Sequence, residues 1–392
     1  MKGYKGFEPG LICRGKQYAE NTVFEEEEAE ICSYGMHFCE NPFDVLDYYG
    51  FINDTGDFNE FAEVEALEEV KTDDNRKFCT KKLKIGAKLS ISKFINACVD
   101  FAIEKTSTCI ADNKISSGNS AKIGSSGNSA KIGSSGNSAQ IGSSGNSAQI
   151  GSSGYSAQIG SSGYSAQIGS SGDSAKIGSS GNSAQIGSSG NSAKIGSSGD
   201  SAKIGSSGNS AQIGSSGYFA QIGSSGNSAQ IGSSGNSAQI GSSGDSAKIG
   251  SSGDSAKIGS SGNSAQIGSS GDSAQIGSSG YSAQIGSSGD SAKIGSSGDS
   301  AKIGSSGNSA QIGSSGYFAQ IGSSGKDCVI CCAGHNSVVK AKKGSWITLA
   351  EWEYSKEKER YIPKCVKTEF VDGERIKEDT LYKLIDGEFV EV

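Results

Sequence analysis

The chain has 392 residues, of which 59 are glycine and only 3 are proline, and its formal net charge is -7. Residues 1–112 carry 13 Lys or Arg against 22 Asp or Glu, whereas the central repeats hold nine Lys and seven Asp. This distribution argues against the basic surface of a nucleic-acid-binding protein. We find no apolar stretch of membrane-spanning length and no signal peptide, so we expect no contact with a membrane.

The ten cysteines all lie in the segments that flank the regular repeats. Without an export signal, they are expected to be free thiols in a reducing cytoplasm rather than a disulfide framework. We therefore predict a cytoplasmic protein.

Residues 1–110 are predicted to form an acidic α+β domain. Strands are expected near residues 3–7, 11–15 and 61–70. A short helix is expected over residues 42–49 with Asn41 as its cap, and a second one over 89–103, beginning at Ser90 or Ser92.

One pattern in this domain points to a known superfamily. The sequence Gly-Met-His-Phe-Cys at 35–39, a predicted helix, and then Phe-Ala-Glu-Val-Glu-Ala-Leu at 61–67 resemble the order of elements in the ADP-ribosyltransferase superfamily. The resemblance implies that NAD would be the cofactor.

It also implies roles for individual residues. Arg14, in Cys-Arg-Gly, would help to hold the nicotinamide nucleotide, and Glu63 and Glu65 would position the ribose and stabilise an oxocarbenium-like transition state. His37 is a further catalytic candidate. Each also has a plain structural explanation: a surface salt bridge for Arg14, a hydrogen-bonded structural residue for His37, and an acidic strand with two outward side chains for the glutamates.

The centre of the chain, from about residue 115 to 339, repeats a unit of nine residues, Gly-Ser-Ser-Gly-[Asn/Asp/Tyr]-Ser-Ala-[Gln/Lys]-Ile. The closing Ile recurs without a slip from Ile123 to Ile321. Ser-Ala-Gln/Lys-Ile alternates polar and apolar residues and predicts a short strand with Ala and Ile on its inner side. Gly-Ser-Ser-Gly-Asn predicts the turn, with glycines at positive φ and with Asn or Asp bonding its own backbone.

Two units are expected to make one coil of a β-solenoid, because nine residues leave no room for inward side chains after two reversals. The lysines favour this arrangement. Stacking every second unit places Lys on Lys only at Lys176 and Lys194, whereas stacking consecutive units would give four such pairs.

The unit resembles the glycine-rich nonapeptide of calcium-binding RTX β-rolls. The carboxylate that binds calcium in that family is replaced here by Ser, or by Phe at Phe219 and Phe318. We therefore predict a roll that needs no metal.

The fifth and eighth positions of the unit vary together. Six of the seven Asp units carry Lys three residues later, and all five Tyr units carry Gln. Local charge balance on a solvated face explains this pattern, and a ligand-binding face is the alternative. In the second case the contacts would be Tyr155, Tyr164, Tyr218, Tyr281 and Tyr317.

After the repeats, Ile330 and Val339 stay in register and Cys328 takes the inward Ala position. Cys328-x-x-Cys331-Cys332-x-x-His335 contains zinc-ligand types, but small buried residues in a capping coil are the favoured interpretation, so no metal site is predicted.

Strands are expected over residues 346–354, 361–370 and 381–392, with hairpin turns at Asp372-Gly373 and Asp386-Gly387. These strands are predicted to seal the C-terminal end of the solenoid.

The predicted fold is mainly β: a parallel β-solenoid of about 18 residues per coil, flanked by an α+β N-terminal domain and a small β-rich cap. The predicted domains are residues 1–110, 111–340 and 341–392. This layout resembles proteins of Firmicutes and their phages in which a domain of unknown function precedes nine-residue Ser-Gly repeats.

The favoured function is a non-catalytic interaction protein in which the solenoid spaces or displays the acidic domain, without a cofactor. The alternatives are a transferase-like enzyme that uses NAD and a binder that uses the solenoid face. The partner would be a protein or a surface, and copies could associate through solenoid faces or edges.

Overall fold

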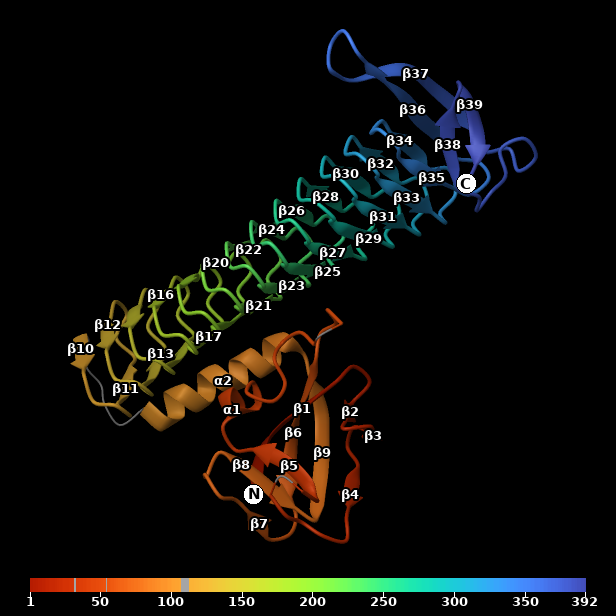
Figure 1. The fold of residues 1–392 in the computed structure, drawn as a ribbon. Helices are drawn as coiled ribbons and strands as arrows, with labels where there is room; N and C mark the ends of the chain where they lie inside the picture. The colour runs from red at the N-terminus through yellow and green to blue at the C-terminus, as the bar shows by residue number, and fades with distance from the viewer. Residues whose placement is uncertain (32, 54, 107–112) are drawn as a thin grey trace. The chain divides into compact units, whose positions relative to one another are not determined.

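A computed structural model of the chain describes residues 1–31, 33–53, 55–106 and 113–392. Its contacts divide the chain into two compact units. Unit 1 comprises residues 1–221 and 230–232, and unit 2 comprises residues 222–229 and 233–392. Unit 1 therefore contains the N-terminal domain and the first solenoid coils, and unit 2 contains the later coils and the C-terminal strands (Figure 1). The three predicted domains, with their limits near residues 110 and 340, stay a prediction.

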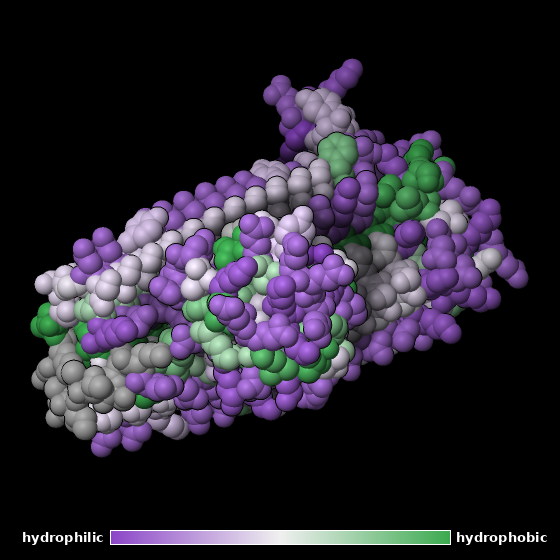
Figure 2. All heavy atoms as spheres, turned by 90° about the horizontal axis from the view of Figure 1, so that it is seen from below, coloured by the Kyte–Doolittle hydropathy of each residue, from purple (hydrophilic) through white to green (hydrophobic). Residues whose placement is uncertain are grey.

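The N-terminal domain is built on an antiparallel sheet with the strand order β4-β9-β6-β1-β5-β8-β7. Strands β2 and β3 form a separate hairpin. Figure 2 shows a largely hydrophilic surface on this domain, in keeping with its acidic composition. The elements are β1 (Lys2–Phe7), β2 (Ile12–Cys13), β3 (Lys16–Gln17), β4 (Val23–Glu25), β5 (Met36–Cys39), α1 (Pro42–Val45), β6 (Glu60–Ala66), β7 (Val70–Lys71), β8 (Lys77–Thr80), β9 (Lys82–Leu89) and α2 (Ile91–Thr106).

Both predicted helices form, with the predicted caps. The Asn41 side chain accepts a hydrogen bond from the backbone N–H of Phe43, and the Ser90 hydroxyl accepts one from Lys93. These bonds satisfy N–H groups that have no partner inside the first helical turn. Helix α1 ends at Val45, four residues earlier than expected, and continues as turns.

The central repeats form a parallel β-solenoid of about 13 turns with roughly 18 residues per turn. Each strand pairs with the strand one full coil later, as in Ile123 with Ile141. The prediction of two nonapeptides per coil is therefore confirmed, and Lys176 pairs with Lys194 as expected. Even-numbered and odd-numbered strands form two different sheets of the solenoid (Figure 1).

The strands of the solenoid are four residues long with few exceptions. They are β10 (Asn113–Ser116), β11 (Lys122–Ser125), β12 (Lys131–Ser134), β13 (Gln140–Ser143), β14 (Gln149–Ser152), β15 (Gln158–Ser161), β16 (Gln167–Ser170), β17 (Lys176–Ser179), β18 (Gln185–Ser188), β19 (Lys194–Ser197), β20 (Lys203–Ser206), β21 (Gln212–Ser215), β22 (Gln221–Ser224), β23 (Gln230–Ser233), β24 (Gln239–Ser242), β25 (Lys248–Ser251), β26 (Lys257–Ser260), β27 (Gln266–Ser269), β28 (Gln275–Ser278), β29 (Gln284–Ser287), β30 (Lys293–Ser296), β31 (Lys302–Ser305), β32 (Gln311–Ser314), β33 (Gln320–Ser323), β34 (Val329–Cys332) and β35 (Val338–Lys340).

The position of the strand within the unit differs from the prediction by two residues. The strand is Gln/Lys-Ile-Gly-Ser rather than Ser-Ala-Gln/Lys-Ile. Ala and Ile are buried as expected, as at Ala139 and Ile141, but the serine at the end of the strand also points inward, as at Ser143. The reason is that Ile and this serine are two residues apart and so share one face of the strand.

The role of the repeat glycines also differs from the prediction. Among the described residues, no repeat glycine has a positive φ. Instead, a Cβ placed on the turn residue Gly145 would lie 1.8 Å from the carbonyl oxygen of Gly127, its equivalent one coil earlier. Glycine is required there because stacked turns approach too closely for any side chain.

The Asn and Asp side chains of the turns were expected to bond their own backbone. In unit 2, Asp299 instead accepts a hydrogen bond from the N–H of Tyr317, which is its equivalent in the next coil. The local side-chain bond comes from serine, since Ser134 Oγ accepts from the N–H of Gly136. The turn polar groups therefore connect coils as well as closing turns.

The C-terminal strands are β36 (Trp346–Ser355), β37 (Arg360–Phe370), β38 (Tyr382–Ile385) and β39 (Glu388–Glu391). Strand β36 pairs with β34 and strand β38 pairs with β35, so both terminal edges of the solenoid in unit 2 are covered. The predicted cap is confirmed. Asp386-Gly387 makes the β38–β39 hairpin turn, but Asp372-Gly373 does not make a hairpin, because β37 and β38 belong to different sheets.

Candidate interaction site

Helix α2 packs against the outer face of odd-numbered solenoid strands within unit 1, along β11, β13, β15 and β17. Its residues Ile95, Val99 and Ala102 are buried and share one side of the helix, because they are four and three positions apart. Burying each of the larger side chains contributes roughly 1.5–3 kcal/mol. This apolar stripe attaches the N-terminal domain to the solenoid.

The solenoid residues under this stripe are the strand glycines. A Cβ on Gly160 would lie 3.1 Å from both Val99 Cα and Ala102 Cβ. A Cβ on Gly196 would lie 2.9 Å from the side chains of Ile95 and Phe51. The glycines therefore form a smooth surface that lets a helix approach the sheet closely.

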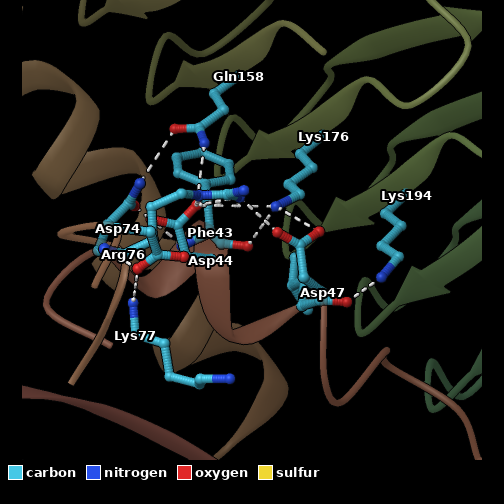
Figure 3. Close-up of polar contacts among 11 residues, drawn as sticks. Phe43, Asp44, Asp47, Asp74, Arg76, Lys77, Gln158, Lys176 and Lys194 are labelled. Atoms are coloured by element: carbon cyan, nitrogen blue, oxygen red, sulfur yellow. Dashed lines mark hydrogen bonds and ion pairs between the residues drawn. The ribbon is translucent and has the colours of Figure 1, made fainter. Parts of the chain in front are cut away.

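A polar cluster borders the apolar contact, at the end of α1 (Figure 3). Lys176 Nζ lies 2.8 Å from Asp47 Oδ1 and 3.9 Å from Asp44 Oδ1, and it donates a hydrogen bond to the carbonyl oxygen of Phe43 at 3.0 Å. The side chain of Lys176 is only 8% exposed. Its charge is thus compensated by two carboxylates and by the carbonyl oxygen of Phe43, which also accepts a hydrogen bond from the backbone N–H of Leu46.

Lys194 lies one coil further along and donates to the carbonyl oxygen of Leu46. The pKa of Lys194 is lowered to about 8, mainly by burial; Asp47 opposes this change, and the positive charge of Lys176 adds to it. The two stacked lysines therefore both face the end of α1, which supplies carboxylates and carbonyl oxygens (Figure 3).

Arg76 and Gln158 complete the cluster. Arg76 forms ion pairs with Asp44 and Asp47, and Gln158 Nε2 donates to Asp44 Oδ1 at 3.4 Å. Asn41 donates in turn to Gln158 Oε1 at 3.2 Å. The polar groups of this cluster therefore bind one another across the contact between the N-terminal domain and the solenoid strands of unit 1.

The glutamates proposed for catalysis lie on strand β6, between β9 and β1. Glu63 is exposed and pairs across the sheet with Tyr4, while Glu65 pairs with Lys2 and Lys84. Glu65 thus has a lysine opposite it on each neighbouring strand, and cross-strand pairs of opposite charge stabilise a sheet.

The other two catalytic candidates lie elsewhere. His37 is on β5, and strand β1 lies between β5 and β6. Two strand spacings put β5 about 10 Å from β6. Burial lowers its pKa, with smaller effects from Lys5, Lys77 and Arg14. Arg14 is exposed at the tip of the β2–β3 hairpin, with φ of 52° followed by Gly15 at 78°. The sheet order does not bring His37 next to the glutamates, and the catalytic roles stay a prediction.

The five repeat tyrosines are all exposed, from 42% at Tyr317 to 62% at Tyr281. They lie in turns rather than on the flat faces of the sheets. Tyr155, Tyr281 and Tyr317 precede odd-numbered strands, whereas Tyr164 and Tyr218 precede even-numbered ones, so they do not line up in one row. Their role in binding stays a prediction.

Cys328 and Cys332 are fully buried and Cys331 is exposed, because neighbouring strand residues point to opposite faces. His335 stacks on Tyr361 with ring centroids 4.3 Å apart. Within the described ranges, no three His, Cys, Asp or Glu residues gather in a way that could hold a metal ion. The same part of the chain contains no helix long and apolar enough to cross a membrane.

The polar cluster was not predicted from sequence. One signal was present, since Lys176 and Lys194 are the only lysines that stack in an 18-residue coil. Two adjacent buried charges of the same sign require nearby acids. The sequence alone did not indicate that Asp44 and Asp47 would supply them.

Comparison with known proteins gives one match. A family model described as a domain of unknown function, DUF7666, matches residues 1–97. No curated protein and no solved structure matched the chain significantly. The match supports the expected domain of unknown function at the N-terminus, and these comparisons support neither the resemblance to ADP-ribosyltransferases nor a phage origin.

Proposed function

We propose that this chain is a non-catalytic interaction scaffold in which the β-solenoid displays the N-terminal domain in one fixed register. The observation that carries the proposal is the double attachment in unit 1. Helix α2 covers the strand glycines, and Lys176 is held by Asp47, Asp44 and the carbonyl oxygen of Phe43.

The energetic balance of this contact supports a permanent attachment. The apolar stripe supplies affinity without direction, because burial of aliphatic groups does not depend on orientation. The Lys176 cluster supplies register, because a shift by one coil would leave a buried ammonium group without its carboxylates. A display role needs both properties.

A transferase-like enzyme that uses NAD is the competing proposal. It requires Arg14, His37, Glu63 and Glu65 to act on one substrate. Their placement on a hairpin tip and on two strands separated by β1 favours the scaffold.

The free thiols support a reducing location. All eight described cysteines are unpaired, and burial raises the pKa of Cys39 to about 12. We propose that the protein works in the cytoplasm.

The experiment incubates the full chain with labelled NAD and bacterial lysate, in parallel with Glu65→Ala and Arg14→Ala. The scaffold proposal expects no label transfer by any of the three. Transfer by the intact chain that is lost in the variants would overturn it.

A second measurement addresses fixed display. Hydrogen exchange of the α2 backbone should be slow in the intact chain. Exchange in α2 as fast as in an unfolded peptide would contradict the proposed attachment.

A further inference from the structure

Unit 2 contains a groove on the outer face of its odd-numbered strands. Its volume is about 630 Å³, its floor includes Gly268, Gly286, Gly304 and Gly322, and it ends at Lys340 and Asp379. Apart from the glycine itself and its two chain neighbours, no described atom lies within 4 Å of the position that a Cβ would take at Gly286 or Gly304.

The same repeat positions in unit 1 are covered by a helix. Gly160, Gly178 and Gly196 occupy these positions on β15, β17 and β19, and side chains of α2 fill the space above all three. The two sets of strands present the same backbone and the same glycines, so they offer the same surface to a ligand.

The polar residues beside the glycines also correspond. The first residue of each strand lies two positions before the strand glycine. On β15, β17 and β19 of unit 1 these first residues are Gln158, Lys176 and Lys194. On β29, β31 and β33 of unit 2 they are Gln284, Lys302 and Gln320. Lys302 is exposed, whereas its counterpart Lys176 binds Asp47 and Asp44. The strands under the groove thus repeat the row of glycines that α2 covers in unit 1. Lys302 comes two residues before Gly304 and lies outside the lining of the groove, at the position that Lys176 takes in unit 1.

We propose that this groove binds an amphipathic α-helix of a partner protein. The helix carries aliphatic or small side chains at positions i, i+4 and i+7, as Ile95, Val99 and Ala102 are spaced in α2, and a carboxylate near it pairs with Lys302. A helix is the favoured occupant because the equivalent surface in this molecule already holds one, with a carboxylate on the corresponding lysine.

The inference deepens the proposed scaffold role and rests on it. The probe is a fluorescent, helix-stabilised peptide with the sequence of residues 91–106, measured by anisotropy against the full chain. We expect saturable binding that weakens at least tenfold in a chain carrying Gly286→Val and Gly304→Val. Lys302→Glu should change the salt dependence of binding to a peptide extended by two Asp residues.

The matched control carries Gly277→Val and Gly295→Val on the even-numbered strands, where a Cβ also meets no described atom within 4 Å. Neither pair lies at positive φ, so both chains should fold equally well, which thermal unfolding checks. A peptide with Asp in place of Ile95 and Val99 should not bind.

Absence of saturable binding, or an equal loss in both pairs of variants, would overturn the proposal. Failure of the scaffold proposal is recognised separately, because label transfer from NAD does not depend on Gly286 or Gly304.

Discussion

Lys176 on solenoid strand β17 forms a 2.8 Å ion pair with Asp47, which follows helix α1 of the N-terminal domain. The lysine side chain is 8% exposed and that of Asp47 is 36% exposed, so the pair is protected from solvent mainly on the lysine side. This contact joins the end of α1 to one solenoid strand within unit 1.

Replacing Lys176 by Ala should destabilise unit 1 by about 1–3 kcal/mol, because Asp47 loses its ion-pair partner and the Phe43 carbonyl loses a buried donor. Urea unfolding measures the change. The control is Lys203→Ala, an exposed lysine on the even-numbered strand β20, which should stay within about 0.5 kcal/mol of the parent chain. Equal effects of both substitutions would show that Lys176 does not hold the domain.

Replacing Gly160 by Val should loosen the attachment of α2, since its Cβ would lie 3.1 Å from the backbone at Val99. We expect much faster hydrogen exchange in α2, while the solenoid strands keep their protection. Gly169→Val is the matched control, because no described atom lies within 4 Å of a Cβ there. Unchanged exchange in the Gly160 variant would contradict the proposed contact.

Replacing the turn glycine Gly145 by Ala should destabilise the solenoid by about 3 kcal/mol or more, because even a methyl group would lie 1.8 Å from the Gly127 oxygen. Gly151→Ala, on an open strand face, should have little effect. Thermal unfolding followed by circular dichroism compares the two. If both chains melt at the same temperature, the turns do not stack as described.

Lys194 should make the stability of unit 1 depend on pH. Burial lowers its pKa to about 8 in the folded chain, from an ordinary value near 10.5, so the unfolded chain binds more protons between these values. The contribution of Lys194 therefore becomes more favourable as pH rises through about 8 toward 10.5. Asp47 and Lys176 are the charged groups that face it.

The measurement compares melting temperatures of the parent chain and Lys194→Gln from pH 7 to 10. Buried thiols act in the opposite direction, because burial raises the pKa of Cys39 to about 12. The difference between the two chains isolates the lysine, and the parent should gain stability relative to the variant as pH rises. A constant difference would mean that Lys194 keeps an ordinary pKa.

The sequence by itself determined the repeat architecture. Local periodicity places Ala139 and Ile141 inward, and the single Lys176–Lys194 stack indicates two units per coil, because like charges avoid stacking. Helix caps at Asn41 and Ser90 were equally predictable, because a cap depends on residues close in sequence.

Only the tertiary structure decided what the glycines and lysines do. A glycine in a repeat suggests a turn with positive φ, yet Gly145 is required by the coil beneath it and Gly160 by a helix above it. Lys176 looked balanced by the Asp three residues earlier in its own unit, but its carboxylates come from Asp44 and Asp47. Close approach and charge pairing depend on which distant segments meet in space. A repeat sequence that varies at only a few positions does not specify where that meeting occurs.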